Sequence, residues 1–411
     1  MRKLIKNVNI FDGKNSSLLM AQNIVVEDNL VKEITDNYID ETSFQQVIDG
    51  RGKTAMPGMV DSHVHLGMIF SKEHENLDYA IALSVAKCKD MLYAGFTTLR
   101  DAGSVPIGLK RSFDCGVLEG PRIYPCNSYI SQTSGHGDEA FAHERRDIQY
   151  RVPSYTCLVD GKAEMMRAVR EQFYRGASHI KLMAGGGCVS ACDPIETVQF
   201  TLEESKAAVE VARDYGSYVM AHLYTPKCIR RALEAGIISL EHAHMIDDET
   251  AKAVEDAGAY VDPMPQFNKY QDMIGSENMP EKDALIRSYE DRATEVLNRH
   301  NIKILFGTDT MITGPDYKIE QSQDLLYYKK RFGNYRTIYA ATGMASEILS
   351  MTTYQNPYPK GKIGLLEEGA YADILLVEGG NPAEDVAILS DVKNIKLIMK
   401  DGIVYKDEMM K

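Results

Sequence analysis

One unit recurs through the middle of this chain: an amphipathic helix, a glycine that ends it, and a short strand of apolar and β-branched residues. We expect helices at residues 78–94, 162–175, 202–215, 227–235, 250–257 and 282–300. In the last range Leu285, Tyr289 and Val296 fall on one stripe, as the helical period requires. Strands that alternate with helices in this way indicate βαβ units and a parallel sheet.

The strands after these helices are short and end in polar residues. We expect them at 96–100, 179–183, 218–222, 237–242, 259–262 and 302–306, with two more at 60–65 and near 121–129. Eight parallel strands can close into a (β/α)8 TIM barrel. An open doubly wound sheet is the alternative, but no glycine-rich phosphate turn follows the first strand. We therefore predict the fold class α/β, with a (β/α)8 barrel over residues 56–357.

The two ends of the chain carry a different pattern. Residues 1–55 and 358–411 contain short β-rich runs such as 23–27, 372–377 and 395–399, and Asp401-Gly402 is a hairpin signal. The 411 residues are enough for a barrel of about 250 residues and a second module. We expect the two ends to form one composite β-sandwich domain beside the barrel.

Charge and composition restrict the partners and the compartment. The net charge of −13 argues against nucleic acid and against an acidic membrane surface. There is no apolar run of 18 residues, and the first residues lack the apolar core of a signal peptide. The seven cysteines form no C-x-x-C pair, which favours reduced thiols. We therefore expect a cytoplasmic protein.

The pentapeptide Asp61-Ser62-His63-Val64-His65 lies in the first predicted strand of the barrel. Residues i and i+2 of a strand point to the same face, so the two imidazoles share one face. Further candidate metal ligands at later strands are Lys181, His222, His242 and Asp309. Any one of them could be an ordinary polar residue or a helix cap. Together they predict a divalent-metal site at the carboxyl ends of the strands, where such barrels keep their chemistry.

Lys181 stands inside the apolar segment 179–183. A charged lysine there would be costly without a partner, so one interpretation is a buried ion pair. The other is a neutral amine, with its pKa lowered by burial, that adds carbon dioxide. The resulting carbamate is anionic and has two oxygens, so it could bridge two metal ions.

The motifs D-x-H-x-H, I-K-L-M-A-G-G-G, A-H, S-L-E-H and G-T-D-T, in this order, resemble those of the amidohydrolase superfamily. The segment G-L-L-E-E-G-A-Y-A-D-I-L-L-V is similar to the strands that return to the terminal sandwich of that superfamily, so the resemblance covers nearly the full length. T-T-L-R-D-A-G and S-G-H-G-D resemble the branch of Xaa-Pro dipeptidases (prolidases) and Xaa-Arg/Lys carboxypeptidases. Imidazolonepropionase is a neighbouring relative.

The resemblance implies a role for each candidate residue. One metal ion, buried more deeply, would be held by His63, His65, Lys181 and Asp309. Carboxylated Lys181 would bridge to a second ion held by His222 and His242, and a bridging hydroxide would be the nucleophile. Asp309 would carry the proton to the leaving amine, and His136 and Tyr224 would contact the substrate. Zinc suits these ligands best, and His244 could replace His242.

The resemblance further implies a metal-dependent hydrolase that cleaves an amide bond next to a free carboxylate, in dipeptides or N-acyl amino acids. A cyclic-amide hydrolase of the imidazolonepropionase type, with one metal ion, is the alternative among enzymes. A non-catalytic barrel scaffold is the alternative of another class, and it would be expected to lose ligands. The partners we expect are a small peptide-like substrate and further copies of the chain in a homo-oligomer.

Overall fold

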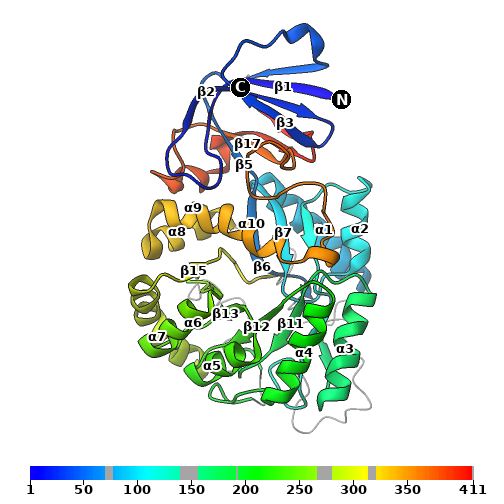
Figure 1. Ribbon diagram of the computed structural model, residues 1–411, viewed down its shortest axis with the longest axis vertical. Coiled ribbons are helices and arrows are strands. Elements are labelled where there is room, and N and C mark those ends of the chain that lie inside the picture. Colours follow the sequence, from blue (N-terminus) through cyan, green and yellow to red (C-terminus); the bar gives the residue numbers. More distant parts are fainter. Residues whose placement is uncertain (70–76, 139–155, 191–192, 266–279, 313–320, 410–411) are drawn as a thin grey trace.

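The computed structural model describes residues 1–69, 77–138, 156–190, 193–265, 280–312 and 321–409. Strands from both ends of the chain form a sheet at one end of the molecule, and parallel strands with their helices form the other end (Figure 1). Three helices lie between these two parts: α8 (Gln321–Phe332), α9 (Asn334–Ala340) and α10 (Gly343–Ser350).

The parallel strands form two sheets. The seven-stranded sheet runs in the order β10 (Thr156–Leu158), β9 (Tyr129–Ser131), β11 (Ile180–Met183), β12 (Val219–Leu223), β13 (Ser239–His242), β14 (Tyr260–Asp262) and β15 (Lys303–Ile304). The four-stranded sheet runs in the order β16 (Thr310–Ile312), β6 (Met59–Ile69), β7 (Phe96–Asp101) and β8 (Arg122–Tyr124). The α/β class and its parallel pairing are therefore confirmed.

The helices between these strands begin and end within two residues of the predicted positions. They are α1 (Leu77–Tyr93), α3 (Lys162–Tyr174), α4 (Leu202–Asp214), α5 (Pro226–Ala235), α6 (Asp248–Ala257) and α7 (Pro280–Arg299), with a further helix α2 (Ile107–Asp114). Gly236 and Gly258 end α5 and α6 in the left-handed conformation, with φ of 90° and 63°. Only glycine adopts this conformation without steric cost, which is why the glycines marked the helix ends in the sequence.

Two of the predicted strands are broken. The strand expected near 121–129 is divided into β8 and β9, because Pro125 has no N–H for the ladder and Asn127 has a φ of 63°. The strand predicted at 302–306 is shortened to β15, and a separate strand, β16, follows after Asp309, which has a φ of 52°. Within the described residues the ladder therefore forms two parallel sheets, and not the single closed ladder of eight strands that we expected.

Backbone hydrogen bonds join the two sheets at these breaks. The N–H of Ser104 donates to the carbonyl of Asn127 at 2.7 Å. The N–H of Ser62 donates to the carbonyl of Phe306, also at 2.7 Å. These contacts hold β6 beside the chain that follows β15, and this proximity brings the two ends of the parallel region together at the functional site.

The third sheet takes strands from both ends of the chain. Its order is β19 (Ile403–Asp407), β18 (Ile395–Lys400), β17 (Ile374–Val377), β5 (Thr54–Pro57), β1 (Arg2–Ile10), β2 (Leu19–Glu27) and β3 (Leu30–Thr35), and β4 (Gln46–Asp49) also pairs with β1. Asp401 and Gly402, both with positive φ, form the hairpin predicted between β18 and β19. Both ends thus share one sheet, while the two-layer sandwich and its boundaries stay predictions.

Strand β17 shows how this sheet is held in place. Leu375 and Val377 pack into the core of the parallel region, whereas Ile374 and Leu376 pack into a separate core among the terminal strands. Successive side chains of a strand point to opposite faces, so both faces of β17 are buried. This explains why the strand is apolar at every position.

A buried ion pair reinforces the same junction. Arg122 of β8 donates from Nε and Nη2 to Asp373 at 3.1 and 3.2 Å, and from Nη2 to Asp401 at 2.7 Å. The guanidinium also lies 4.0 Å from the ring centroid of Tyr371. Arg122 and Asp373 are almost fully buried, so each charge depends on the other for its stability.

We predict that Arg122→Met lowers the free energy of unfolding by about 3–5 kcal/mol, because Asp373 then keeps a buried charge without its main partner. Urea denaturation followed by circular dichroism measures this change. Lys362→Met is the control, since Lys362 pairs with Glu367 at an exposed position and should lose less than about 1 kcal/mol. Equal effects of the two substitutions would contradict a special role for the buried pair.

Candidate metal centre

His63 and His65 lie near the middle of β6 and share one face, as predicted. Their Nε2 atoms are 3.3 Å apart, and both side chains are buried. The Nδ1 of His65 donates to the carbonyl of Gly103 at 3.1 Å. Because Nδ1 of His65 carries the proton, its Nε2 presents a lone pair to the same point as the Nε2 of His63.

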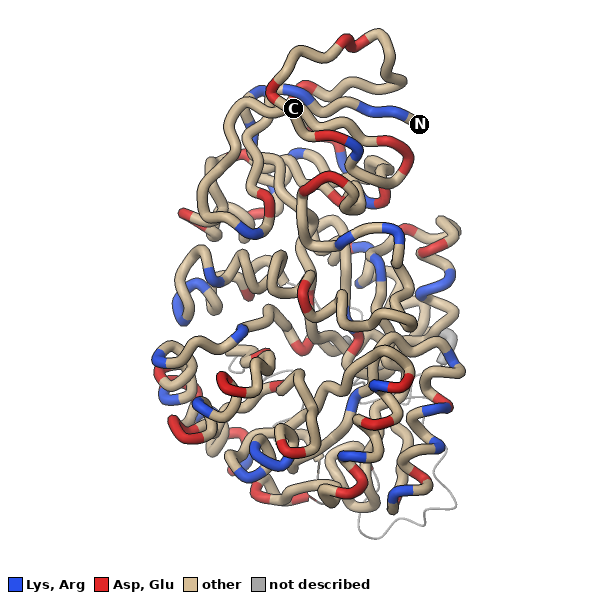
Figure 2. The backbone as a smooth tube through the Cα atoms, viewed as in Figure 1, with Lys and Arg blue, Asp and Glu red and all other residues tan. Residues whose placement is uncertain are grey.

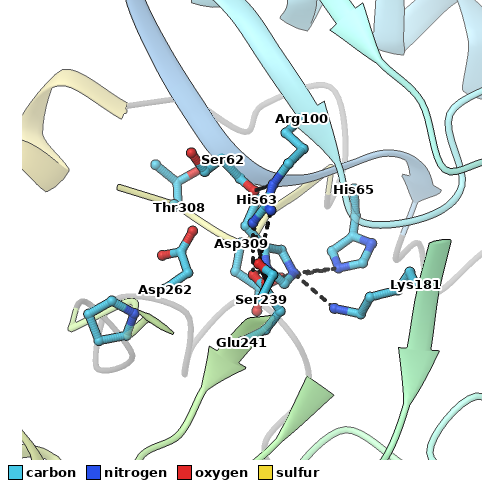
Figure 3. Close-up of polar contacts among 12 residues, drawn as sticks. Ser62, His63, His65, Arg100, Lys181, Ser239, Glu241, Asp262, Thr308 and Asp309 are labelled. Carbon is cyan, nitrogen blue, oxygen red and sulfur yellow. Dashed lines mark hydrogen bonds and ion pairs between the residues drawn. The ribbon is translucent and has the colours of Figure 1, made fainter. Parts of the chain in front are cut away.

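Glu241 fixes the orientation of His63 from behind. The Nδ1 of His63 donates to Oε2 of Glu241 at 2.6 Å. Arg100 donates from Nη2 to the two carboxylate oxygens at 3.2 and 3.3 Å, and the hydroxyl of Ser239 donates to Oε1 at 2.6 Å. This arrangement sets the tautomer of His63 and leaves its Nε2 available as a ligand. Figure 3 shows His63 at the centre of these contacts.

Asp309 approaches the same two nitrogens from the chain after β15. Its Oδ1 is 3.4 Å from Nε2 of His63 and 3.3 Å from Nε2 of His65. Burial would raise the pKa of Asp309, but the neighbouring His65, His63 and Lys181 outweigh it and hold the pKa below its usual value. With 23% of its side chain exposed, this carboxylate borders on both the buried histidines and the solvent.

Asp61 places the Asp309 segment. Its carboxylate accepts from the N–H and the hydroxyl of Thr308 at 3.1 and 2.6 Å, and from the N–H of His63 at 3.1 Å. The N–H of Asp309 in turn donates to the carbonyl of His63 at 2.8 Å. Asp61 is therefore a support for the site, and the first residue of D-x-H-x-H does not point at the histidine nitrogens.

Lys181 of β11 enters the cluster from the opposite sheet. Its Nζ is 3.5 Å from Nε2 of His63, and the side chain is 1% exposed. Burial lowers the pKa of Lys181, although the carboxylates of Glu241 and Asp309 act in the other direction. Lys181, predicted from its place in an apolar strand, is thus brought into contact with the predicted histidines (Figure 3).

His222 and His242 form a second pair on the neighbouring strands β12 and β13. Their ring centroids are 4.5 Å apart, and the ring of His242 is 5.4 Å from that of His63. Ligand atoms of His63, His242 and Asp309 all lie within 4.8 Å of one another. Burial, followed by the neighbouring histidines and Lys181, lowers the pKa values of His222 and His242 well below the usual range. Both rings are therefore held in the neutral form that binds metal ions.

The backbone is strained at two of these positions. His242 and Asp309 have φ angles of 71° and 52°, in a region that non-glycine residues seldom occupy. Such residues cost about 1–3 kcal/mol each and cluster at functional sites. Each of these residues ends a strand or follows one, where the bend turns the side chain toward the cluster.

The donor set fits a divalent cation. Ring nitrogens of His63 and His242 and a carboxylate oxygen of Asp309 lie close together. The Nδ1 atoms of His63 and His65 already donate to Glu241 and to the carbonyl of Gly103, so their Nε2 atoms are left to bind a cation. Zinc is bound by such nitrogen and oxygen ligands. A deeper group of His63, Glu241 and Asp262 also has ligand atoms within 4.8 Å. In that group the guanidinium of Arg100 already balances the negative charge of Glu241, so a metal ion there would add a second positive charge.

His136 and Tyr224, predicted as substrate contacts, lie beside the second pair of histidines. The ring of His136 stacks on that of His222 at 4.1 Å. The ring of Tyr224 is 4.8 Å from His222 and 5.4 Å from His242. Burial lowers the pKa of His136 to about 4 and raises that of Tyr224 well above its usual value, so both side chains are neutral.

His244 is turned away from the other histidines. Its Nε2 donates to the carbonyl of Pro263 at 2.7 Å, and its ring stacks on Tyr224 at 5.6 Å. The sequence left open whether His244 replaces His242, and the geometry favours His242. Residues that the sequence analysis missed are Arg100, Glu241, Asp61 and Asp262. Their only signal was a charged residue within a strand of the parallel region, which does not say what the charge contacts.

Buried histidines and an aspartate at the ends of parallel strands are typical of metal-dependent hydrolases. Residues 54–404 match the amidohydrolase family. Ochratoxinase of Aspergillus niger is 30% identical in an alignment that covers 96% of this chain and 83% of that enzyme. The chain belongs to the amidohydrolase family.

Two solved structures are similar over nearly the whole chain. One is a prolidase in complex with N-methylphosphonate-L-proline, with 30% identity and a TM-score of 0.89 over 99% of this chain and 100% of that one. The other is a Xaa-Pro dipeptidase with methionine bound in its active site, with 28% identity and a TM-score of 0.84 over the same shares. This chain is accordingly a hydrolase, and its fold is the one that these enzymes share.

We predict that Glu241→Gln weakens metal binding about ten- to hundredfold, because the amide no longer balances Arg100 and holds His63 less firmly. Competition with a chelator measures the affinity, and elemental analysis gives the metal content. Glu347→Gln, at an exposed ion pair with Lys303, is the control and should leave both unchanged. Unaltered affinity in Glu241→Gln would exclude the carboxylate as a support of the metal ligands.

Proposed function

We propose that this chain is a binuclear metal-dependent hydrolase that cleaves an amide bond next to a free carboxylate, in dipeptides or N-acyl amino acids. The observation that carries this proposal is the position of two neutral hydrogen-bond donors, His136 and Tyr224, beside the second histidine pair. Two of the similar structures support it. One binds a derivative of L-proline and the other binds methionine, and both of these amino acids carry such a carboxylate.

The two ions are proposed to be zinc. His63, His65 and Asp309 would hold one of them, and His222 and His242 the other. When bound, such ions lower the pKa of water and polarise a carbonyl group. The cyclic-amide alternative uses one ion, so the number bound per chain distinguishes the two functions. A non-catalytic scaffold does not agree with a chain that brings all six predicted ligand residues together.

Lys181 is proposed to carry a carboxylate. Its unprotonated amine forms an N–C bond to carbon dioxide, and the proton released goes to solvent. The support is geometric: an ammonium 3.5 Å from Nε2 of His63 would repel a cation bound at that nitrogen. The carbamate reverses the charge, and its two oxygens allow Lys181 to reach both histidine pairs.

Asp309 is proposed to be the proton carrier. Its lowered pKa keeps it as a carboxylate at neutral pH, ready to accept a proton, and its partial exposure lets it face the substrate. It would then return the proton to the nitrogen of the leaving amine. Asp61 and Thr308 hold the segment while Asp309 alternates between its two protonation states.

His136 and Tyr224 are proposed to bind the substrate carboxylate. A phenol and a neutral imidazole can both donate hydrogen bonds to it without adding a buried fixed charge. Their rings lie against His222, so a carboxylate bound there places the neighbouring amide carbonyl close to the histidine pair. This geometry selects substrates in which the amide and the carboxylate are near each other.

The wider setting follows the same proposal. We infer a (β/α)8-type barrel whose ladder is interrupted, with a composite β-sandwich, located in the cytoplasm as a homo-oligomer, with a small peptide-like substrate and no nucleic-acid or membrane partner. In the described part of the chain, no helix is long and apolar enough to cross a membrane. Figure 2 shows acidic and basic residues interspersed along the outer helices, in a chain with a net charge of −13.

We predict that Lys181→Ala loses activity and most of its bound metal, and that short carboxylic acids restore part of both by replacing the missing carboxylate. Elemental analysis and turnover measure the two effects. Lys303→Ala, at a partly exposed lysine, is the control. An experimental electron-density map of the wild type with metals bound and an unmodified lysine would contradict the carbamate.

The second prediction of this proposal concerns the substrate. The wild type should cleave free dipeptides much better than dipeptide amides. Tyr224→Phe should raise KM for the free acids about ten- to hundredfold, since a hydrogen bond to a charged group contributes roughly 1.5–3 kcal/mol. It should affect the amides much less.

The matched control for this substitution is Tyr174→Phe, because Tyr174 is the last residue of α3 and is 90% exposed to solvent. A library of dipeptides and N-acyl amino acids, each as the free acid and as the amide, provides the measurement. If the wild type cleaves both forms equally well, carboxylate recognition is wrong and the cyclic-amide function is favoured.

A further inference from the structure

Lys282 lies in the first turn of α7 and contacts the chain that follows β11. Its Nζ donates to three backbone carbonyls, those of Gly187, Ser190 and Asp193, at 3.0, 2.7 and 2.6 Å. A lysine ammonium has three N–H donors, so every one of them is used. The nearest carboxylate oxygen of Asp193 is 3.7 Å away. One cation thus fastens α7 to this segment mainly through the peptide backbone.

The same segment holds His136. The Nδ1 of His136 lies 2.6 Å from the hydroxyl oxygen of Ser190, and its backbone N–H donates to Oε1 of Gln199 at 2.8 Å. Gln199 donates from Nε2 to Oδ2 of Asp193 at 3.1 Å, and the N–H of Gly187 donates to that oxygen at 2.9 Å. The side chain and the backbone of His136 are therefore both held by groups that connect to Asp193.

There is little space for His136 to shift. A Cβ at Gly187 would lie 1.9 Å from Nδ1 of the imidazole, so the ring is in close contact with that backbone. The ring also stacks on His222 at 4.1 Å. Because the ring fits between fixed groups, the position of this segment sets the position of the imidazole.

One helical turn after Lys282, Ile286 reaches the second substrate contact. Ile286 is 1% exposed and belongs to a small apolar cluster with Cys188, Ile195 and Tyr224. The thiol of Cys188 also lies 3.9 Å from the backbone carbonyl of Lys282. Residues four apart lie on the same face of a helix. The start of α7 therefore supports His136 through a charge and Tyr224 through apolar packing.

We propose that Lys282 is a positioning residue for recognition of the substrate carboxylate, acting through Ser190 and His136. This inference rests on the proposed function, in which His136 contacts that carboxylate. The backbone of the metal ligands is placed by other elements: the ladder of β12 and β13 places His222 and His242, and Glu241 orients His63. Loss of the ammonium should therefore weaken substrate binding and leave the metal ions in place.

Lys282→Met tests this, because methionine keeps an apolar stem of similar length and removes the charge. For free-acid substrates KM should rise about ten- to hundredfold while kcat stays within about threefold, as expected for a misplaced binding group. Metal content should be unchanged. Lys252→Met, at an exposed lysine that pairs within α6, is the matched control and should leave KM unaltered. Parallel losses of kcat and metal in Lys282→Met would overturn the proposal, since they indicate a purely structural role.

Chemical rescue provides a second test. Lys282→Ala lacks the three carbons and the nitrogen of n-propylammonium, so this cation should enter the three-carbonyl site and lower KM. Tetramethylammonium has no N–H donor and should have no effect. Equal effects of the two cations would overturn the proposal.

A spectroscopic measurement separates this inference from the proposed function. If the wild type cleaves no amide with a free carboxylate, the proposed function fails, but the ¹⁵N resonances of the His136 ring still report its contact with Ser190. These resonances, assigned with His136→Asn, should shift in Lys282→Met and stay in place in Lys252→Met. Unshifted resonances in Lys282→Met would overturn the positioning role whatever the substrate.

Discussion

The buried carboxylate of Glu241 is the interaction on which the rest of the site depends. It is fully buried between Arg100 and His63, so its negative charge is stable only because the guanidinium neutralises it. That pairing in turn fixes the tautomer of His63, and Nε2 of His63 is the atom near which His65, Lys181 and Asp309 all converge. A structural ion pair thereby determines the direction of a ligand lone pair.

The breaks in the parallel strands have a related consequence. A continuous ladder would hold every backbone group at the ends of β8 and β15 in regular pairing, and the side chains would alternate strictly. The interruptions at Pro125–Asn127 and near Asp309 free the chain to bend. The positive φ of Asp309 and of His242 turns these two side chains toward the histidines of β6. Irregular backbone thus occurs at the two positions where the site brings side chains from different strands to one point.

The surroundings of the site differ in how firmly they are held. Most of the candidate metal ligands lie on strands whose backbone is fixed by parallel ladders, and Arg122 and β17 secure the terminal sheet against that framework. His136, by contrast, depends on a segment outside the ladder, which Lys282 and Asp193 hold by side-chain contacts. This division agrees with the general arrangement in which a rigid sheet carries the chemistry and adjustable loops carry the specificity.

The sequence by itself determined the helices, their glycine ends, the α/β class and the residues that converge on the metal centre, because periodicity and strand-end position are local properties. It did not determine that the strand near 121–129 breaks in two, since that depends on which sheet each half joins. Nor did it identify Glu241, Arg100 or Lys282 as supports. Glu241 is 141 residues from Arg100 and 178 from His63, and Lys282 is 89 to 95 residues from the carbonyls that it contacts. These groups are adjacent only in the fold, where burial makes an unpaired charge costly. The tertiary structure decided those partners, because packing brings polar groups from distant parts of the chain together and excludes the water that would otherwise bind them.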